Sequence, residues 1–111
     1  MGLIYKITNV INNKSYIGMT CATLEQRWKS HCSEARRKSM YLFHCAIRKY
    51  GENSFIRCIL QEGEDDWEKL GLLEDQFIKS ENTKPPNGYN LNDGGYGAPG
   101  HIWTEEEKYI Q

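Results

Sequence analysis

The chain has 111 residues, of which 39% are hydrophobic and 26% charged, and its formal net charge at pH 7 is −1. This length suffices for one domain with a modest core, and the composition is typical of a globular protein rather than a disordered one. No apolar run approaches the roughly 20 residues that a transmembrane helix requires, and the first residues lack the basic and apolar regions of a secretion signal. We therefore expect a cytoplasmic protein that is not secreted and has no membrane partner.

The basic and acidic residues are unevenly distributed along the chain. Residues 1–61 hold ten Lys and Arg against three acids, and residues 62–111 hold four Lys against twelve acids. The two segments therefore carry +7 and −8. A basic face of this kind suits a phosphate backbone, although two solvated faces that happen to differ explain the counts equally well.

The cysteines and histidines show no metal-binding spacing. The cysteines stand at positions 21, 32, 45 and 58 without a C-x-x-C pair, and the histidines at 31, 44 and 101 complete no zinc motif. In a chain without a secretion signal we expect four free, buried thiols.

The first twenty residues predict a β-hairpin. Residues 3–9 and 15–20 have strand-like patterns around a two-residue turn at 12–13, where two asparagines tolerate positive φ. Paired positions then sum to 25, which gives Tyr5 and Tyr16 the parity to lie on one face of the sheet.

Two helices are expected next. Thr23 begins the first helix with a capping box, because Gln26 follows three residues later. A second helix is expected over residues 41–50, with Gly51 ending it in the left-handed αL conformation. The apolar stripe of the first helix consists of Leu24, Trp28, Cys32 and Ala35.

The rest of the chain predicts a strand, a third helix and a tail. Residues 55–61 alternate with mostly apolar residues on both sides, which indicates a strand covered on both faces. Asp65 or Asp66 then caps a helix that reaches about Ser80. These elements predict an α+β domain, in which a small three-stranded, mainly antiparallel sheet is flanked by about three helices. Residues 96–111 have the composition of a linker followed by the start of another helix.

The predicted third helix contains one acid at an inward position. Glu74 lies among Leu70, Leu73, Phe77 and Ile78 on the expected buried stripe. A carboxylate there loses its solvation unless it meets a cation or a metal ion. The alternative is a position at the flank of the stripe, where the carboxylate reaches water.

The first helix carries an arginine and a histidine beside its apolar stripe. Arg27 and His31 are four residues apart, so their side chains share one edge of the core-facing side. The pair does not stabilise itself, because both groups are donors when the histidine is charged, but it suits an anion such as phosphate. The alternative is a solvated basic face, which Lys29 and Arg36 also indicate.

Six short elements follow one another at spacings that form a recognisable pattern. They are Leu3-Ile4-Tyr5, Tyr16-Ile17-Gly18, Arg27 with His31, residues 46–51 followed by Phe55, Glu74 within residues 72–78, and Asn90 within residues 88–91. Together they resemble the GIY-YIG nuclease family over residues 2–95, in the style of phage intron-encoded homing endonucleases. Leu3 stands where the family name has glycine, but that residue does no chemistry.

The resemblance implies a fold, an activity and partners. It implies a GIY-YIG catalytic domain over residues 1–95, acting as a DNA endonuclease that hydrolyses phosphodiester bonds of double-stranded DNA. Residues 96–111 resemble a linker and the start of a DNA-binding module, which implies a C-terminal recognition module. The family resemblance also implies a bacterial or phage-infected host cell. A structure-specific or repair nuclease with the same chemistry, or a nucleic-acid-binding module without catalysis, stays open, as does the oligomeric state.

The resemblance also implies how the reaction is catalysed. Glu74 would hold one divalent cation, Mg²⁺ or Mn²⁺, which together with Arg27 stabilises the charge on the phosphate. Tyr5 is favoured as the group that activates the attacking water, although the choice between the tyrosines stays open. Asn90 would orient a phosphate or brace the site. The candidate catalytic residues are therefore Tyr5, Tyr16, Arg27, His31, Glu74 and Asn90.

Overall fold

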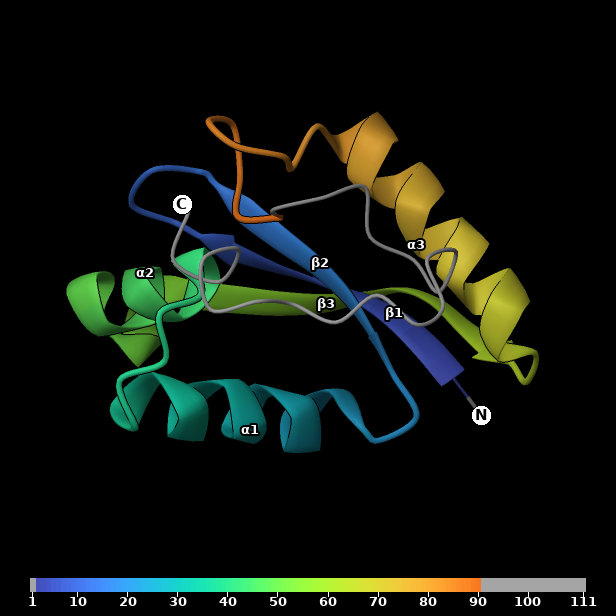
Figure 1. Ribbon diagram of the computed structural model, residues 1–111, viewed down its shortest axis with the longest axis horizontal. Coiled ribbons are helices and arrows are strands. Elements are labelled where there is room, and N and C mark those ends of the chain that lie inside the picture. Colours follow the sequence, from blue (N-terminus) through green and yellow to red (C-terminus); the bar gives the residue numbers. More distant parts are fainter. Residues whose placement is uncertain (1, 91–111) are drawn as a thin grey trace.

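Residues 2–90, the part of the chain that the computed structural model describes, form an antiparallel sheet with helices on both faces (Figure 1). The strand order is β2-β1-β3, so the first strand lies in the centre. The elements are β1 (Gly2–Asn9), β2 (Ser15–Thr20), α1 (Leu24–Arg36), α2 (Leu42–Tyr50), the short 3-10 helix η1 (Glu52–Ser54), β3 (Phe55–Glu64) and α3 (Trp67–Glu81). The expected α+β architecture is confirmed. Within residues 2–90 no helix is long and apolar enough to span a membrane.

The side chains of β1 alternate between two separate cores, because successive residues of a strand point to opposite faces. The larger aromatic core comprises Leu3, Tyr5, Ile7, Trp28, Cys32, Ala35, Phe43, Ala46, Ile47, Phe55 and Tyr89. The smaller aliphatic core comprises Ile4, Ile17, Leu70 and Ile78. Helices α1 and α2 close the first core and α3 closes the second, so the sheet runs between α1 and α3 (Figure 1).

The hairpin differs from the expected register. Leu3 pairs with Thr20 and Tyr5 with Gly18, so paired positions sum to 23 rather than 25. The connection is longer than a two-residue turn, because the Asn9 amide donates to the Lys14 carbonyl at 2.9 Å across residues 10–13. Both sums are odd, so the two tyrosines still share a face of the sheet.

The helix ends follow the capping signals in the sequence. Thr23 forms the expected capping box with Gln26, and Asp66, rather than Asp65, accepts hydrogen bonds from the first turn of α3. Helix α2 begins at Leu42, one residue later than expected. Gly51 ends it at φ 88° and ψ 147°, which is a positive φ but not the expected αL conformation.

The expectation of a third strand buried on both faces is wrong. Strand β3 lies at the edge of the sheet and most of its residues are exposed or half-buried, including Ile56 and Ile59 at 61% and 44% exposure. Alternation of apolar residues did not distinguish an edge strand from a central one. The two register shifts along its pairing with β1 are irregularities typical of edge strands.

The cysteines are free thiols, as expected, but only Cys32 is buried. Cys21 and Cys58 are exposed and Cys45 is half-buried, so the expectation of four buried thiols is wrong. We expected a linker and the start of a DNA-binding module at residues 96–111. These residues, which include His101, lie outside the described part of the chain.

Candidate active site

Tyr5 is a buried tyrosine at the centre of the molecule. It lies on β1, is 1% exposed, and shares a hydrogen bond of 2.8 Å between its hydroxyl and Nε2 of His31 on α1. The Tyr16 ring lies 6.3 Å from the Tyr5 ring, and it also contacts the His31 ring edge-on at 5.4 Å. Helix α1 and the β-hairpin thus bring three of the predicted residues together.

Gly18 leaves the space that the Tyr5 side chain occupies. It is the cross-strand partner of Tyr5, and a Cβ at this position would overlap the Tyr5 hydroxyl and the ring carbon that carries it. The glycine of the Tyr16-Ile17-Gly18 element is therefore required by the tyrosine opposite it. Sequence reasoning assigned no role to Gly18, although a glycine in the middle of a strand indicates close approach of another group.

His31 continues into a second buried histidine that the sequence analysis did not single out. Nδ1 of His31 lies 2.8 Å from Nε2 of His44 on α2, and Nδ1 of His44 lies 2.7 Å from Oγ of Ser39. His31 and His44 are 2% and 3% exposed. The available signal was a histidine between Phe43 and Ile47 on the apolar side of the second helix.

Burial and positive charge keep both histidines neutral. Burial above all, followed by the charges of Arg27 and His44, lowers the pKa of His31 to about 2. Burial, Arg27 and Arg48 lower the pKa of His44 to about 4. The expectation that Arg27 and His31 together suit a phosphate does not fit the histidine, which is buried and neutral and forms hydrogen bonds within the aromatic core.

Arg27 acts on both tyrosines. Burial raises the pKa of Tyr5 to about 12, while Arg27 lowers it as a nearby charge and as a hydrogen-bond partner. Burial also raises the pKa of Tyr16 well above its ordinary value, and Arg27 again opposes the shift. Burial lowers the pKa of Arg27 itself, but Tyr5 and Tyr16 together with Glu34 outweigh that effect and raise it. Arg27 is half-buried, so the solvated-face alternative does not describe it.

Glu74 is a buried acid on α3. It is 8% exposed and shares the buried side of the helix with Leu70, Gly71 and Ile78, so it lies on the buried stripe and not at an exposed flank. Its charge raises the pKa of Tyr5 and of Tyr16, which places it within electrostatic range of both. Carboxylate and phenol oxygens are hard donors of the kind that Mg²⁺ prefers, so the residues present fit such an ion.

Asn90 braces the outer edge of β2. Its Oδ1 accepts hydrogen bonds from the Ile17 amide at 2.9 Å and from Oγ1 of Thr83 at 2.8 Å. Its Nδ2 donates to the Ile17 carbonyl at 2.8 Å. Next to it, the Tyr89 amide donates to the Ser15 carbonyl at 2.9 Å. Asn90 therefore replaces a missing neighbouring strand beside Tyr16, and the geometry favours the bracing role over contact with a phosphate.

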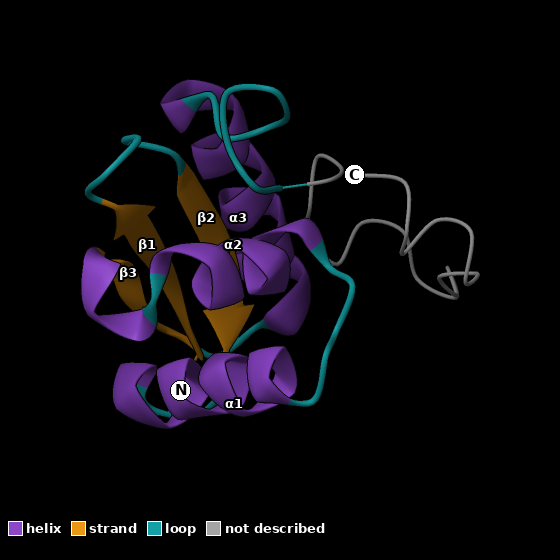
Figure 2. Cartoon of the chain, turned by 90° about the vertical axis from the view of Figure 1, so that its left-hand side faces the viewer, coloured by secondary structure: helices purple, strands orange, loops and turns teal. Residues whose placement is uncertain are grey.

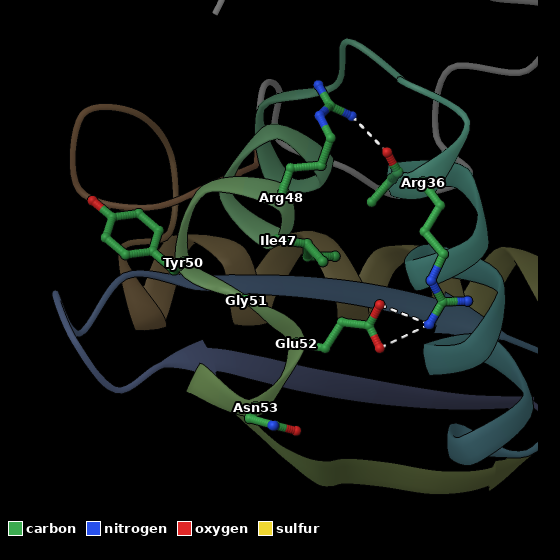
Figure 3. Close-up of a pocket in the computed structure, with 8 residues that line it drawn as sticks. Arg36, Ile47, Arg48, Tyr50, Gly51, Glu52 and Asn53 are labelled. Atoms are coloured by element: carbon green, nitrogen blue, oxygen red, sulfur yellow. Dashed lines mark hydrogen bonds and ion pairs between the residues drawn. The ribbon is translucent and has the colours of Figure 1, made fainter.

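An open hollow at the C-terminal ends of α1 and α2 is lined by none of the candidate catalytic residues (Figure 3). Arg36 and Glu52 face each other across it in a two-pronged ion pair, with Nη2 of Arg36 at 2.9 and 2.7 Å from the carboxylate oxygens. Arg48 donates to the Ala35 carbonyl at 2.9 Å and so holds α2 against α1. The Arg48 contact joins the two helices that carry His31 and His44, and the Arg36 ion pair joins α1 to η1.

Comparison with known proteins identifies the domain. The family model described as "GIY-YIG catalytic domain" matches residues 1–90. The chain belongs to this family. As a GIY-YIG nuclease domain it is 32% identical to the solved structure of the catalytic domain of homing endonuclease I-TevI, with a TM-score of 0.71, covering 83% of this chain and 99% of that one.

Curated relatives of this GIY-YIG domain come from viruses. Intron-associated endonuclease 1 of Enterobacteria phage T4 is 34% identical over 96 residues, which are 85% of this chain and 38% of that protein. Protein 146R of Invertebrate iridescent virus 6 is 39% identical over 83 residues, which are 74% of this chain and 34% of that protein. The chain thus spans less than half the length of the curated relatives it matches.

Proposed function

We propose that this domain hydrolyses phosphodiester bonds of double-stranded DNA with one divalent cation, Mg²⁺ or Mn²⁺, held by Glu74. One observation carries the proposal: the Tyr5 hydroxyl is bonded to a neutral histidine, while the cation Arg27 and the buried anion Glu74 both act on it. Titratable groups with strongly shifted pKa values gather at catalytic sites.

Tyr5 is the proposed general base, with His31 as its orienting partner. In the tautomer with the proton on Nδ1, Nε2 of His31 accepts a hydrogen bond from the Tyr5 hydroxyl and so orients the phenol oxygen. The base itself is the phenolate, so Tyr5 must lose its own proton before it can take one from a water molecule. With a pKa of about 12, Tyr5 is a poor base near neutral pH. Positive charge lowers that pKa, and Arg27 already supplies some of it.

Arg27 is the proposed partner of the reacting phosphate. Its guanidinium is permanently charged and offers a planar set of donors to phosphate oxygens, and it is fixed beside the tyrosines rather than free in solvent. It would stabilise the additional charge of the transition state. A divalent ion at Glu74, when bound, supplies further positive charge to the phosphate and to the activated water.

The DNA-bound enzyme is proposed to be part of a longer protein. The basic residues of the first half of the chain hold the phosphate backbone, and residues 96–111 lead into a C-terminal recognition module. The comparison with relatives more than twice as long supports this division. The proposed place of action is the cytoplasm of a bacterial or phage-infected host cell.

Nicking of a supercoiled plasmid tests the proposal. The wild-type chain should nick DNA with Mg²⁺ and not in excess chelator. Glu74→Gln should fold, because the amide keeps the shape of the side chain, and should lose at least about two orders of magnitude in rate. Glu68→Gln, at an exposed position of the same helix, is the matched control and should keep its rate. A folded Glu74→Gln chain with wild-type nicking would refute the metal site.

A further inference from the structure

Three side chains outside the proposed Mg²⁺ site converge where α1 meets α2. They are His31 and Glu34, one turn apart on α1, and His44 on α2, and their ligand atoms all lie within 4.8 Å of one another. Nε2 of His44 lies 2.8 Å from Nδ1 of His31 and 3.4 Å from Oε2 of Glu34. We propose that this cluster, here called the His-His-Glu site, binds one Zn²⁺-type transition-metal ion.

The two histidines are held as metal-ligating histidines usually are. The outer nitrogen of His31 contacts the Tyr5 hydroxyl, and the outer nitrogen of His44 contacts the Ser39 hydroxyl. Such contacts on the second ring nitrogen fix the ring and its tautomer, and they leave the inner nitrogen as the ligand atom. The inner nitrogens therefore face each other across the position of the ion.

The distances require only a small adjustment. Two nitrogens bound to tetrahedral Zn²⁺ at about 2.0–2.1 Å lie about 3.3 Å apart. The separation of His44 Nε2 and Glu34 Oε2 already has this size, and that of the two histidine nitrogens, now bridged by one proton, must widen by about half an ångström. The ion thus replaces the shared proton.

The charge and chemistry of the site select the ion. Both imidazoles are neutral at pH 7, which leaves their lone pairs available. Arg27 and Arg48 oppose a cation at this position, and the Glu34 carboxylate, whose side chain is 46% exposed, supplies the compensating charge next to solvent. Two nitrogens and one oxygen, with water completing the fourth position, suit Zn²⁺ or Co²⁺ and not Mg²⁺, which prefers six oxygens.

Occupancy has a consequence for Tyr5 that rests on the proposed function. An ion on Nδ1 of His31 leaves the ring proton on Nε2, which then donates to the Tyr5 oxygen instead of accepting from it. This donated hydrogen bond and the positive charge of the ion both stabilise the phenolate form and should lower the pKa of Tyr5. Zn²⁺ should therefore shift the pH dependence of DNA nicking to lower pH, and it should do so at lower concentration in the wild type than in Glu34→Gln.

Co²⁺ titration of the full 111-residue chain, with protein folding followed by circular dichroism, tests the binding itself. The wild type should bind one equivalent with the visible absorption of tetrahedral Co²⁺, and Zn²⁺ should displace it. Glu34→Gln and His44→Gln should weaken binding at least about tenfold, and Ser39→Ala about 10–100-fold through the lost support of His44. Glu34→Gln alters a half-exposed side chain, so it tests the site even if His44→Gln destabilises the fold.

Two control variants separate this site from other groups and from the nuclease proposal. Glu25→Gln, on the exposed side of α1, and Glu74→Gln should bind Co²⁺ like the wild type. Wild-type affinity in folded Glu34→Gln, absence of the tetrahedral absorption, or a thiolate-to-cobalt charge-transfer band from the cysteines would overturn the His-His-Glu site. A chain that binds Co²⁺ here but never nicks DNA would refute the nuclease proposal alone.

Discussion

The two faces of the sheet bury polar groups in different ways. On the face of α1 and α2, the aromatic core encloses a network of neutral groups that runs from Tyr5 through His31 and His44 to Ser39. On the face of α3, the aliphatic core is smaller, and the buried polar group of that helix is the acid Glu74. Figure 2 shows α1 below the strands and α2 nearest the viewer, with α3 behind α2.

The difference shows how one small domain can keep the proposed proton-transfer group, Tyr5, and the proposed ion-binding group, Glu74, in separate environments. Neutral groups satisfied by hydrogen bonds are buried at little cost in stability. A buried carboxylate is tolerated when cations or donors compensate it. The central strand separates the two environments, and Tyr5 and Tyr16 are within electrostatic range of both.

The largest expected effect comes from substituting Arg27, which lowers the pKa of both tyrosines on the aromatic face. Arg27→Ala should lower the nicking rate by about 10²–10³-fold, because a fixed donor to the transition state is lost, with a much smaller change in DNA affinity. Lys29→Ala, at an exposed position of the same helix, should instead weaken binding modestly and reduce its salt dependence. Equal kinetic profiles for the two variants would make Arg27 an ordinary backbone contact.

A substitution in β2 tests how tightly the aromatic face is packed. Gly18→Ala should destabilise the fold by about 1–3 kcal/mol, because the new methyl group overlaps the Tyr5 phenol. Ile17→Val, the next residue on the same strand but on the aliphatic face, should cost about 0.5–1.5 kcal/mol. Urea denaturation measures both, and a Gly18→Ala chain as stable as the wild type would contradict the described position of Tyr5.

Acid pH should lower the free energy of unfolding, because the aromatic core contains two neutral histidines. An unfolded histidine has a pKa near 6.5, and the folded values of His31 and His44 are about 2 and about 4. Below pH 6.5 the unfolded chain therefore binds protons that the folded chain does not, and the free energy of unfolding decreases as the pH falls. Above pH 6.5 this contribution of the histidines to stability is fully present. The loss should be about 2 kcal/mol per histidine at pH 5.

Denaturation in a metal chelator at pH 7 and pH 5 measures this loss. The matched variant is His44→Gln, which removes one of the two titrating groups and should reduce the difference between the two pH values by about 2 kcal/mol. An unchanged pH dependence in that variant would mean that His44 is protonated in the folded state.

The smallest expected effect is DNA sequence preference, because neither face presents an element suited to reading bases. The described basic residues lie mainly on α1 and at the ends of α1 and α2, where they suit phosphates. The 111-residue chain should therefore bind DNA weakly and with similar affinity for unrelated sequences, as measured by fluorescence anisotropy at moderate salt. Nanomolar, sequence-selective binding would show that the catalytic domain carries its own specificity.

The sequence was sufficient to predict the helices and strands, but not which of them pair or pack with each other. Capping residues such as Thr23 and Asp66 define helix starts because their effect is local. The position of β3 at the edge depends on which strand pairs with β1, a contact across fifty residues that alternation does not encode. The hairpin register failed for a related reason, because the side chains of Asn9 and Asn12 bond backbone amides within the longer loop.

For the candidate site, the sequence indicated residues of unusual chemistry but not their partners. Glu74 stood out because an acid on an apolar stripe conflicts with its surroundings, and it is buried in the structure. His44 and Ser39 did not stand out, because a histidine near a helix start has many ordinary explanations. Only the packing of α2 on α1 brings them to His31. The catalytic roles themselves remain predictions that the variants above test.

The hydrogen bonds of Tyr89 and Asn90 to β2 also bear on how the protein is made. The exposed backbone of β2 beside Tyr16 is completed by residues more than seventy positions later in the chain. During synthesis on the ribosome, the hairpin emerges first but stays without its outer support until residue 90 has left the exit tunnel, since domains fold as units. An interrupted messenger RNA would therefore yield fragments that carry the tyrosines without a finished catalytic centre.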